Sequence, residues 1–261
     1  MIVTSPYNID IPATDVASFV FHSQSSASRN APQYFDASCP GKCFSLSQAE
    51  TAAVGVLAAR CVFTAASPSA SASELEYQLR NSDAKLVLAS RDRLAIAREA
   101  MSKADLGPDQ LLIFSDLDED LSQSQPLSPP SWTSIWRPAE EVQSWSWKPI
   151  TTLKEAQQTT AIINYSSGTT GLPKGVEISH YNAVANATQL LFKRAMAADT
   201  ALGRCRKARL NQSGERWLAP LPMYHAYGQT YYCINAARCG AKVFIMRSFN
   251  VEQYLVRDDL N

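Results

Sequence analysis

The sequence predicts an α/β fold in which largely parallel sheets are flanked by helices. Its apolar runs at 84–90 (AKLVLAS) and 110–116 (QLLIFSD) show no regular alternation with polar residues. Strands of that kind are buried on both faces, which is typical of parallel sheets. Segments with helical spacing of apolar residues separate the runs, and this order indicates strand–helix–strand units.

The first half of the chain supplies most of these elements. A helix is expected over 14–23, where Thr14 is placed to cap it. Residues 33–46 predict two strands around a Pro-Gly turn, and 45–60 predict one amphipathic helix. Further elements are a strand over 61–66, a helix over 69–83 with Ser73 as its cap, and a helix over 93–102.

Residues 116–150 have a different composition. The segment is rich in Ser, Pro, Asp and Gln, which predicts a surface loop or linker. It also holds tryptophans that are expected to pack the loop against the body of the protein, namely Trp132, Trp136, Trp145 and Trp147.

Order returns near residue 151. A helix over 181–196 is expected to turn Val184, Ala187, Leu191 and Ala195 inward. Strands are expected over 160–166, 176–179, 216–221 and 241–246. The chain is therefore expected to form a first α/β part over 1–115, the loop over 116–150, and a second α/β part over 151–261.

Composition limits the classes of function. Among 261 residues, 24 Lys and Arg balance 24 Asp and Glu, so nothing favours a nucleic-acid partner. The N-terminus lacks the pattern of a signal peptide, and no apolar run is long enough to span a bilayer. The six cysteines read as reduced thiols without a zinc-binding pattern, so no metal site is predicted among them.

The chemistry concentrates in residues 164–180, NYSSGTTGLPKGVEISH. Its glycines permit positive φ and a close approach of ligand to backbone, and successive free N–H groups form an anion-binding nest. Hydroxyl groups add donors, and Lys174 adds a mobile positive charge. The segment therefore predicts a cradle for the phosphates of a nucleotide. The residues assigned to it are Ser166, Ser167, Gly168, Thr169, Thr170, Gly171 and Lys174.

A Walker loop and a surface hairpin are the two alternative interpretations of this segment. A Walker loop needs Gly before its Lys and a helix after it, but here Pro173 precedes Lys174 and a strand is expected to follow. The remaining alternative is a flexible surface hairpin without a ligand. The combination of hydroxyls, glycines and one lysine after a buried strand favours the phosphate cradle.

These residues carry a family resemblance. The segment YSSGTTGLPKGVEISHYN closely resembles the phosphate-binding signature of the adenylate-forming enzymes, which include acyl-CoA synthetases, luciferases and peptide-synthetase adenylation domains. PLPMYHAYG at 220–228 resembles their next motif, and ELEYQLRNSDAKLVLAS resembles their N-terminal subdomain. The residues of these motifs are most similar to those of 4-coumarate–CoA ligase-like enzymes, fungal ones especially.

The resemblance implies a reaction and roles for residues. In that family a carboxylate attacks the α-phosphate of ATP, pyrophosphate leaves, and the thiol of coenzyme A then displaces AMP. By position, Lys174 would meet the charge of the pyrophosphate, His225 would contact the acyl-adenylate, and Tyr227 would line the acyl pocket. His180 is expected to be structural, and Arg247 is a weak candidate for a coenzyme A contact.

The resemblance also has gaps. The adenine-binding and ribose-binding motifs, the glutamate that holds Mg²⁺, and the C-terminal domain with its catalytic lysine are not found in the 261 residues. Residues 45–68 resemble the front of one family helix joined to the end of a later one. The chain is therefore expected to be an incomplete AMP-binding N-terminal domain, inactive as written, with exposed apolar patches.

Three hypotheses for the function remain. The first is the lineage of ATP-dependent acyl-CoA ligases for aryl or medium-chain acids. The second is a non-catalytic fragment that binds nucleotide or a protein partner, and the third is a peptide-synthetase adenylation domain. The expected location is cytoplasmic, or peroxisomal if a further C-terminal segment carries the signal.

Overall fold

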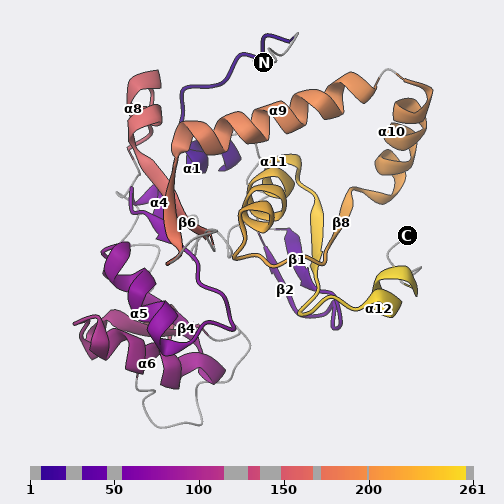
Figure 1. Ribbon diagram of the computed structural model, residues 1–261. Coiled ribbons are helices and arrows are strands. Elements are labelled where there is room, and N and C mark those ends of the chain that lie inside the picture. Colours follow the sequence, from indigo (N-terminus) through magenta and orange to yellow (C-terminus); the bar gives the residue numbers. More distant parts are fainter. Residues whose placement is uncertain are drawn as a thin grey trace. The chain divides into compact units, whose positions relative to one another are not determined.

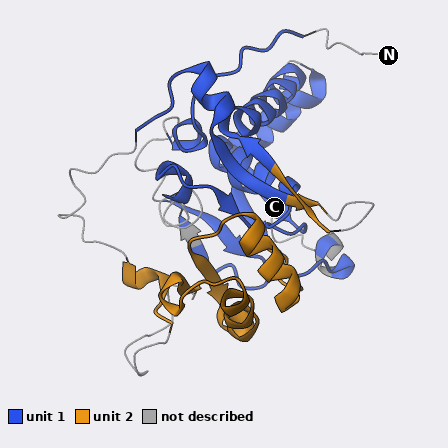
Figure 2. Ribbon diagram, turned by 60° about the vertical axis from the view of Figure 1, so that its left-hand side comes forward, with its two compact units in different colours: residues 1–65, 147–164, 177–261 blue, residues 66–146, 165–176 orange. Residues whose placement is uncertain are grey.

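The computed structural model describes residues 7–21, 31–45, 55–114, 129–135, 148–166, 172–198 and 200–256. Figure 1 shows strands alternating with helices along the chain, which confirms the α/β fold. Two compact units interleave in sequence (Figure 2). Unit 1 comprises 1–65, 147–164 and 177–261, and unit 2 comprises 66–146 and 165–176.

Unit 1 contains a four-stranded sheet in the order β2-β1-β9-β8. β1 pairs in parallel with β9, and β9 pairs in parallel with β8, whereas β2 runs antiparallel to β1. Largely parallel pairing, as the sequence predicts, is thus confirmed for this sheet. The strands are β1 (Pro32–Asp36), β2 (Cys43–Ser45), β8 (Arg216–Ala219) and β9 (Lys242–Ile245).

The turn between β1 and β2 lies where the sequence predicts it. The helix expected over 45–60, however, does not begin at residue 45. The N–H of Lys42 donates to the carbonyl of Cys39 at 2.8 Å and closes the turn. Ser45 belongs to β2 and pairs with Pro32, so the expected start of that helix is wrong. Its described part is α4 (Gly55–Ala58), and residues 46–54 fall outside the described chain.

Both faces of this sheet are covered. Val243 is fully buried in a core cluster with Val16 and Val184, which come from helices. Its neighbour Phe244 belongs to a second cluster and stacks on Phe35 with ring centroids 4.9 Å apart. Because successive strand residues point to opposite faces, the two clusters lie on the two sides of the sheet. Burial of one such valine contributes about 1.5–3 kcal/mol.

The long helix α9 is the centre of the helical layer of unit 1 (Figure 1). It packs against α1, α8, α10 and the π-helix η6. Val184 and Ala187 are buried as expected and Leu191 is partly buried, but Ala195 is exposed. The helices are α1 (Val16–Phe21), α8 (Leu153–Gln158), α9 (His180–Ala198), α10 (Ala201–Ser213), η6 (Gly228–Asn235), α11 (Ala236–Cys239) and α12 (Val251–Val256).

The start of α1 differs from the expectation. Asp15, not Thr14, caps the helix, because its Oδ1 accepts the N–H of Ser18 at 2.7 Å. The second oxygen of Asp15 accepts the Ser18 hydroxyl at 2.8 Å and the N–H of Ile150 at 2.9 Å. A carboxylate accepts more bonds than a threonine hydroxyl, so one side chain caps the helix and ties it to residue 150.

A smaller sheet carries the segment of chemical interest. Its order is β3-β6-β7, and β3 (Phe63–Thr64) pairs in parallel with β6 (Thr160–Ser166). β7 (Lys174–Ser179) follows β6 directly in the sheet. The expected strands over 160–166 and 176–179 are thereby confirmed, and β7 begins two residues earlier than predicted.

Unit 2 is a two-stranded parallel sheet with helices. β4 (Val87–Ser90) pairs with β5 (Leu111–Phe114), and α5 (Ala72–Asn81) and α6 (Leu94–Lys103) share a core cluster with both strands. The cap of α5 is Ser71, not Ser73. Ser71 accepts the N–H of Glu74, whose carboxylate accepts the N–H of Ser71 at 2.8 Å. This reciprocal arrangement is a capping box.

One face of β4 is open, contrary to the prediction of a strand buried on both faces. Val87 and Ala89 are buried, whereas Leu86 and Leu88 are exposed. The apolar residues of 84–90 follow one another without polar alternation, but the helices of unit 2 cover only one face of β4.

Little of the loop over 116–150 belongs to the described chain. Trp132 lies in the short helix η5 (Trp132–Ile135), is buried, and packs on Phe114 with ring centroids 5.2 Å apart. The expected packing role is therefore confirmed for this tryptophan. Trp136, Trp145 and Trp147 fall outside the described residues.

Candidate functional site

The Ser/Thr/Gly segment lies between two neighbouring strands. β6 ends at Ser166 and β7 begins at Lys174, within the same three-stranded sheet. The segment therefore joins strand to strand, which confirms that it does not open a helix as a Walker loop does. Between these ends, Ser167, Gly168, Thr169, Thr170 and Gly171 lie outside the part of the chain that the structure describes.

The described ends of this segment face solvent. Ser166 and Lys174 are both exposed. Within the described chain, no hydrogen bond or ion pair engages the amine of Lys174. An ammonium group on a flexible four-carbon stem can follow an anion. Among the described residues, the charge of Lys174 thus has no partner.

The strand before the segment is firmly anchored. Ala161 and Ile162 of β6 are buried in the core of unit 1. The Thr160 hydroxyl donates to the Glu177 carboxylate at 2.8 Å, which adds a side-chain link between β6 and β7. A binding loop mounted on rigid strands is a common arrangement, because the scaffold positions groups that the loop presents.

A tight turn presents His225. Its N–H donates to the carbonyl of Pro222 at 3.2 Å, and its own carbonyl accepts the N–H of Gln229 at 3.0 Å. The side-chain amide of Gln229 donates to the carbonyl of Tyr224 at 2.9 Å. Gly228 is required at this position, because a Cβ there would meet the Pro222 oxygen at 2.3 Å. These contacts hold the turn and leave the imidazole outside it.

The imidazole of His225 is exposed. His225 is therefore not packed in the core. Tyr227, also from the expected site, is 49% exposed and stacks on Tyr231 with centroids 5.1 Å apart. Partial burial raises the pKa of Tyr227, and the neighbouring Tyr231 adds to the effect. Its phenol therefore stays protonated, as a potential donor, at neutral pH.

Sequence reasoning missed the element that follows this turn. Residues from Gly228 onward form the π-helix η6, whose wider turn is uncommon and is frequent at functional sites. Gln229 is buried and bonds back to the turn, so it positions His225 indirectly. A glycine directly after the aromatic run was the available signal for a close backbone approach.

His180 has the structural role expected of it. It is the first residue of α9 and is buried, and its Nδ1 accepts the N–H of Val16 at 3.2 Å. Burial lowers the pKa of His180, Asp15 opposes this, and the charge of Arg60 adds to it. The imidazole is thus held neutral, as an acceptor that connects α9 to α1.

Arg247, the weak candidate for a coenzyme A contact, is already paired. Its Nε and a terminal nitrogen each lie 3.0 Å from Oδ2 of Asp36. Burial alone would raise the pKa of Asp36, but hydrogen bonds from Ser38 and Arg247 lower it to about 2. The Arg247 guanidinium is exposed, whereas the Asp36 side chain is only 13% exposed.

The described residues offer no ligand set for Mg²⁺. They contain no group of three or more His, Cys, Asp and Glu side chains that could hold a metal ion. None of the described helices combines the length and apolarity needed to cross a membrane. Ser166 and Lys174 belong to unit 2, and His225 and Tyr227 share one turn of unit 1.

Comparison with known proteins shows clear similarities. The model of the family described as "AMP-binding enzyme" matches residues 47–258. A protein of Emericella nidulans that carries the name of an acyl-coenzyme A synthetase is 33% identical over 222 residues, which is 83% of this chain and 38% of that protein. The phenylacetyl-CoA ligase of Aspergillus niger is 24% identical over 95% of this chain and 48% of its own length.

Solved structures share the fold. A red-emitting luciferase from Phrixothrix hirtus superposes with a TM-score of 0.69 at 16% identity, over 94% of this chain and 48% of that one. ATP-bound MatB from Rhodopseudomonas palustris gives 0.62 at 15% identity, over 92% of this chain and 46% of that one. The chain thus spans about half the length, or less, of the proteins that it matches here.

Proposed function

Because the chain belongs to the family of AMP-binding enzymes, we propose that it forms the ATP-binding and acid-binding part of an ATP-dependent acyl-CoA ligase. Such an enzyme joins a carboxylic acid to AMP, releases pyrophosphate, and passes the acyl group to the thiol of coenzyme A. The observation that carries the proposal is the exposed Lys174, which has no partner in the described chain and lies three residues after Gly171, the last glycine before it.

Lys174 and the hydroxyls and amides of 166–171 are proposed to hold the ATP phosphates. Negative charge increases on the pyrophosphate as its bond to the α-phosphorus breaks. Donors that are already oriented toward that charge stabilise the transition state without further reorganisation. Support comes from the anchored strand β6 before the segment and from the Lys174 amine after it, which has no partner among the described residues.

His225 and Tyr227 are proposed to contact the acyl end of the substrate. Both are exposed, and one turn holds them close in sequence and space. An imidazole beside the acyl-adenylate can donate to the carbonyl oxygen, and the ring of Tyr227 gives an apolar surface for the acid. The stacked Tyr231 keeps that ring in place.

The acid is proposed to be aryl or medium-chain. The similarity to a phenylacetyl-CoA ligase supports an aryl acid, and so does the aromatic surface of Tyr227 and Tyr231. The names of the relatives also favour coenzyme A over the carrier-domain thiol of a peptide synthetase. The location is proposed to be the cytoplasm or the peroxisome. Imaging of a tagged chain in cells distinguishes the two.

Titration of the chain with ATP tests the phosphate cradle. Lys174→Ala should weaken ATP binding by about tenfold or more, since charge-assisted hydrogen bonds contribute about 1.5–3 kcal/mol. Lys154→Ala is the matched control, because Lys154 is an exposed lysine of unit 1 outside the segment. Equal effects of the two changes, or none, would argue against the cradle.

The 261-residue polypeptide by itself is proposed to form little or no acyl-adenylate. The motifs that the family uses for adenine, ribose and the catalytic lysine are not found in its sequence. Release of AMP should therefore stay at background with ATP, coenzyme A and a panel of aryl and medium-chain acids. Clear AMP formation with any of these acids would contradict this part of the proposal.

A second candidate is a non-catalytic fragment that binds nucleotide or a protein partner. The exposed Leu86 and Leu88 of unit 2 favour it, because neighbouring exposed apolar side chains are common at interaction sites. ATP binding without AMP formation fits this candidate as well as the first. AMP formation excludes it.

A further inference from the structure

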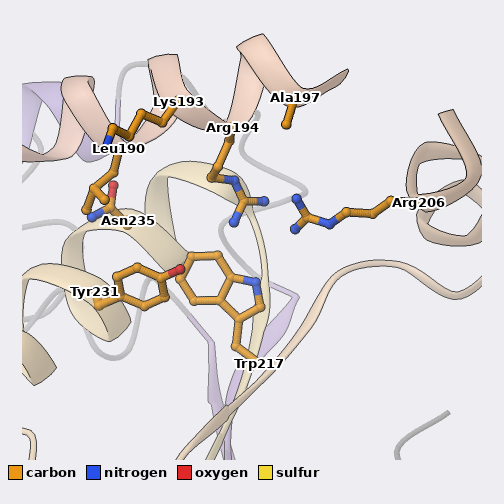
Figure 3. Close-up of a pocket in the computed structure, with 8 residues that line it drawn as sticks. All are labelled: Leu190, Lys193, Arg194, Ala197, Arg206, Trp217, Tyr231 and Asn235. Carbon is orange, nitrogen blue, oxygen red and sulfur yellow. The ribbon is translucent and has the colours of Figure 1, made fainter. Parts of the chain in front are cut away.

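Unit 1 contains a pocket that shares Tyr231 with the proposed acyl surface but includes neither Lys174 nor His225. Its volume is about 250 Å³, and it lies among α9, α10, β8 and η6. Figure 3 shows the guanidiniums of Arg194 and Arg206 at one end and the amide of Asn235 at the other, with two aromatic rings between them. The lining residues are Leu190, Lys193, Arg194, Ala197, Arg206, Trp217, Tyr231 and Asn235.

The cationic end carries more positive charge than its one carboxylate balances. Glu215 Oε1 accepts from the guanidinium of Arg194, from that of Arg206 at 2.9 Å, and from the indole of Trp217 at 2.7 Å. Burial alone would raise the pKa of Glu215, but these donors and charges hold it below its ordinary value. Lys193 also lines the pocket, but Figure 3 shows it beside Leu190 and not with the two guanidiniums.

The guanidiniums of Arg194 and Arg206 have N–H donors that are not used on Glu215. Each offers five N–H donors, and each uses one nitrogen on Glu215. In Figure 3 both guanidiniums point toward the space above Trp217. Like charges that converge in this way repel one another, and a second anion between them would relieve the repulsion. A ligand carboxylate suits this end, because guanidinium groups bind carboxylates in a bidentate fashion.

The walls of the pocket suit a planar ring. Trp217 and Tyr231 adjoin, with ring centroids 4.9 Å apart, and the guanidinium of Arg194 lies 5.2 Å from the centroid of the indole. Leu190 and Ala197 complete the lining on the side of α9. Aromatic side chains favour stacked or edge contacts with another ring.

The far end of the pocket holds an unsatisfied acceptor. Asn235 is 2% exposed, and its Nδ2 donates to the carbonyl of Thr230 at 3.0 Å. Its Oδ1 has no hydrogen-bond partner within the described chain. A buried polar atom left without a partner costs about 1–3 kcal/mol. A ligand that donates a hydrogen bond at this end would remove that cost.

Size selects among the ligands that fit these three features. A cavity of about 150 Å³ accommodates benzene, so a pocket of about 250 Å³ has room for a benzene ring with two small substituents. A nucleotide is too large to be enclosed there. We propose that this pocket binds a small aromatic carboxylate with a hydrogen-bond donor on its ring, of the size of 4-hydroxybenzoate. This site goes beyond the proposed function, because it includes neither Lys174 nor His225.

Calorimetric titration of the chain with 4-hydroxybenzoate, in the absence of ATP, tests the site. Saturable binding is expected, and Arg206→Gln should weaken it by about tenfold, as expected for the loss of a charged hydrogen bond. Arg209→Gln is the matched control, because it removes the same charge from the same exposed helix but does not line the pocket. No binding to folded protein, or equal weakening by both changes, overturns the site.

Two further comparisons test the amide end and the ring. Benzoate should bind about threefold to tenfold more weakly than 4-hydroxybenzoate, because it cannot donate to Asn235 Oδ1. In Asn235→Leu, checked for folding by circular dichroism, that difference should vanish. Displacement of 4-hydroxybenzoate by an equal concentration of inorganic phosphate would instead show a site for anions in general and overturn the aromatic assignment.

One last variant separates this site from the proposed acyl site. His225→Ala should leave the affinity for 4-hydroxybenzoate unchanged, whereas loss of binding would assign the ligand to the acyl site and overturn the pocket. ATP titration with Lys174→Ala reports on the proposed function alone. Failure of either proposal is thus recognised without reference to the other.

Discussion

Strand β9 of unit 1 and strand β4 of unit 2 are built from similar apolar runs but are covered differently. β9 lies between β1 and β8, and core residues cover both its faces at Val243 and Phe244. β4 has the same kind of sequence, yet its helices cover only the face of Val87 and Ala89. An apolar run therefore indicates a strand, but it does not say how many of its faces are covered.

The starts of two helices show a second contrast. In unit 2, α5 begins with a capping box whose partners lie three residues apart. In unit 1, the first residue of α9 is His180, and its bond to Val16 spans 164 residues. A local cap survives wherever the short segment is intact, whereas the bond of His180 depends on the whole unit being folded.

The largest expected effect is that of a charge in the doubly covered strand. Val243→Asp places an unpaired carboxylate at a position with 0% exposure and should destabilise unit 1 by about 4 kcal/mol or more. Amide hydrogen exchange should show loss of protection in β1, β8 and β9. Val243→Thr, which keeps the shape, is the control with a smaller loss. If Val243→Asp lowered the free energy of unfolding by less than about 1 kcal/mol, the contrast between the covered strand β9 and the half-open strand β4 would be wrong.

His180→Leu should have the next largest effect. It leaves the N–H of Val16 without its acceptor inside the core, at a cost of about 1–3 kcal/mol. The pH dependence should change as well. Because the pKa of His180 is lowered in the folded state, the unfolded chain binds more protons once the pH falls below the ordinary value of 6.5.

The contribution of the neutral imidazole is therefore fully present above pH 6.5 and is lost as the pH falls toward the lowered folded pKa. Urea titrations at a series of pH values should show a flatter profile for His180→Leu than for the unchanged chain. His225→Leu, at an exposed histidine, is the control for the replacement of a histidine by leucine. Identical slopes for the His180 variant and the unchanged chain would contradict the assignment.

Ser71→Ala should have a smaller effect, confined to unit 2. Loss of an N-cap costs about 1 kcal/mol, and the opening of α5 is measured by hydrogen exchange of its first turn. Ser73→Ala is the matched control, because Ser73 is exposed in that same turn and does not cap it. If Ser73→Ala opened the first turn of α5 more than Ser71→Ala, Ser73 would be the cap, as the sequence predicts.

Leu88→Lys should have the smallest effect. The side chain is 44% exposed on the open face of β4, and substitutions at such positions change stability by about 0.5 kcal/mol or less. Thermal unfolding measures the change, and solubility should rise as the apolar surface shrinks. A loss above about 2 kcal/mol would show that another element or a partner covers this face.

The features that the sequence predicts correctly depend on residues close together in the chain, whereas the features that it misses depend on residues far apart in the chain. The strand at 160–166, the turn around Pro40 and the strand after Pro173 depend on neighbouring residues, and all three were predicted. The helix α10 was missed because its residues are all at least partly exposed and Leu202 is 81% exposed, so no apolar face marks it. Its contact to the rest of unit 1 includes the pair of Arg206 with Glu215.

The sequence by itself determined the α/β class and the main strands, because apolar spacing and turn chemistry are local properties. The phosphate cradle around Lys174 stays a prediction from the sequence. Only the tertiary structure decided that His180 is a buried acceptor, that one face of β4 stays open, and that Arg194, Arg206 and Trp217 meet at one carboxylate. Those features join residues from different elements. Their contacts form only once the elements pack, and no short stretch of sequence encodes them.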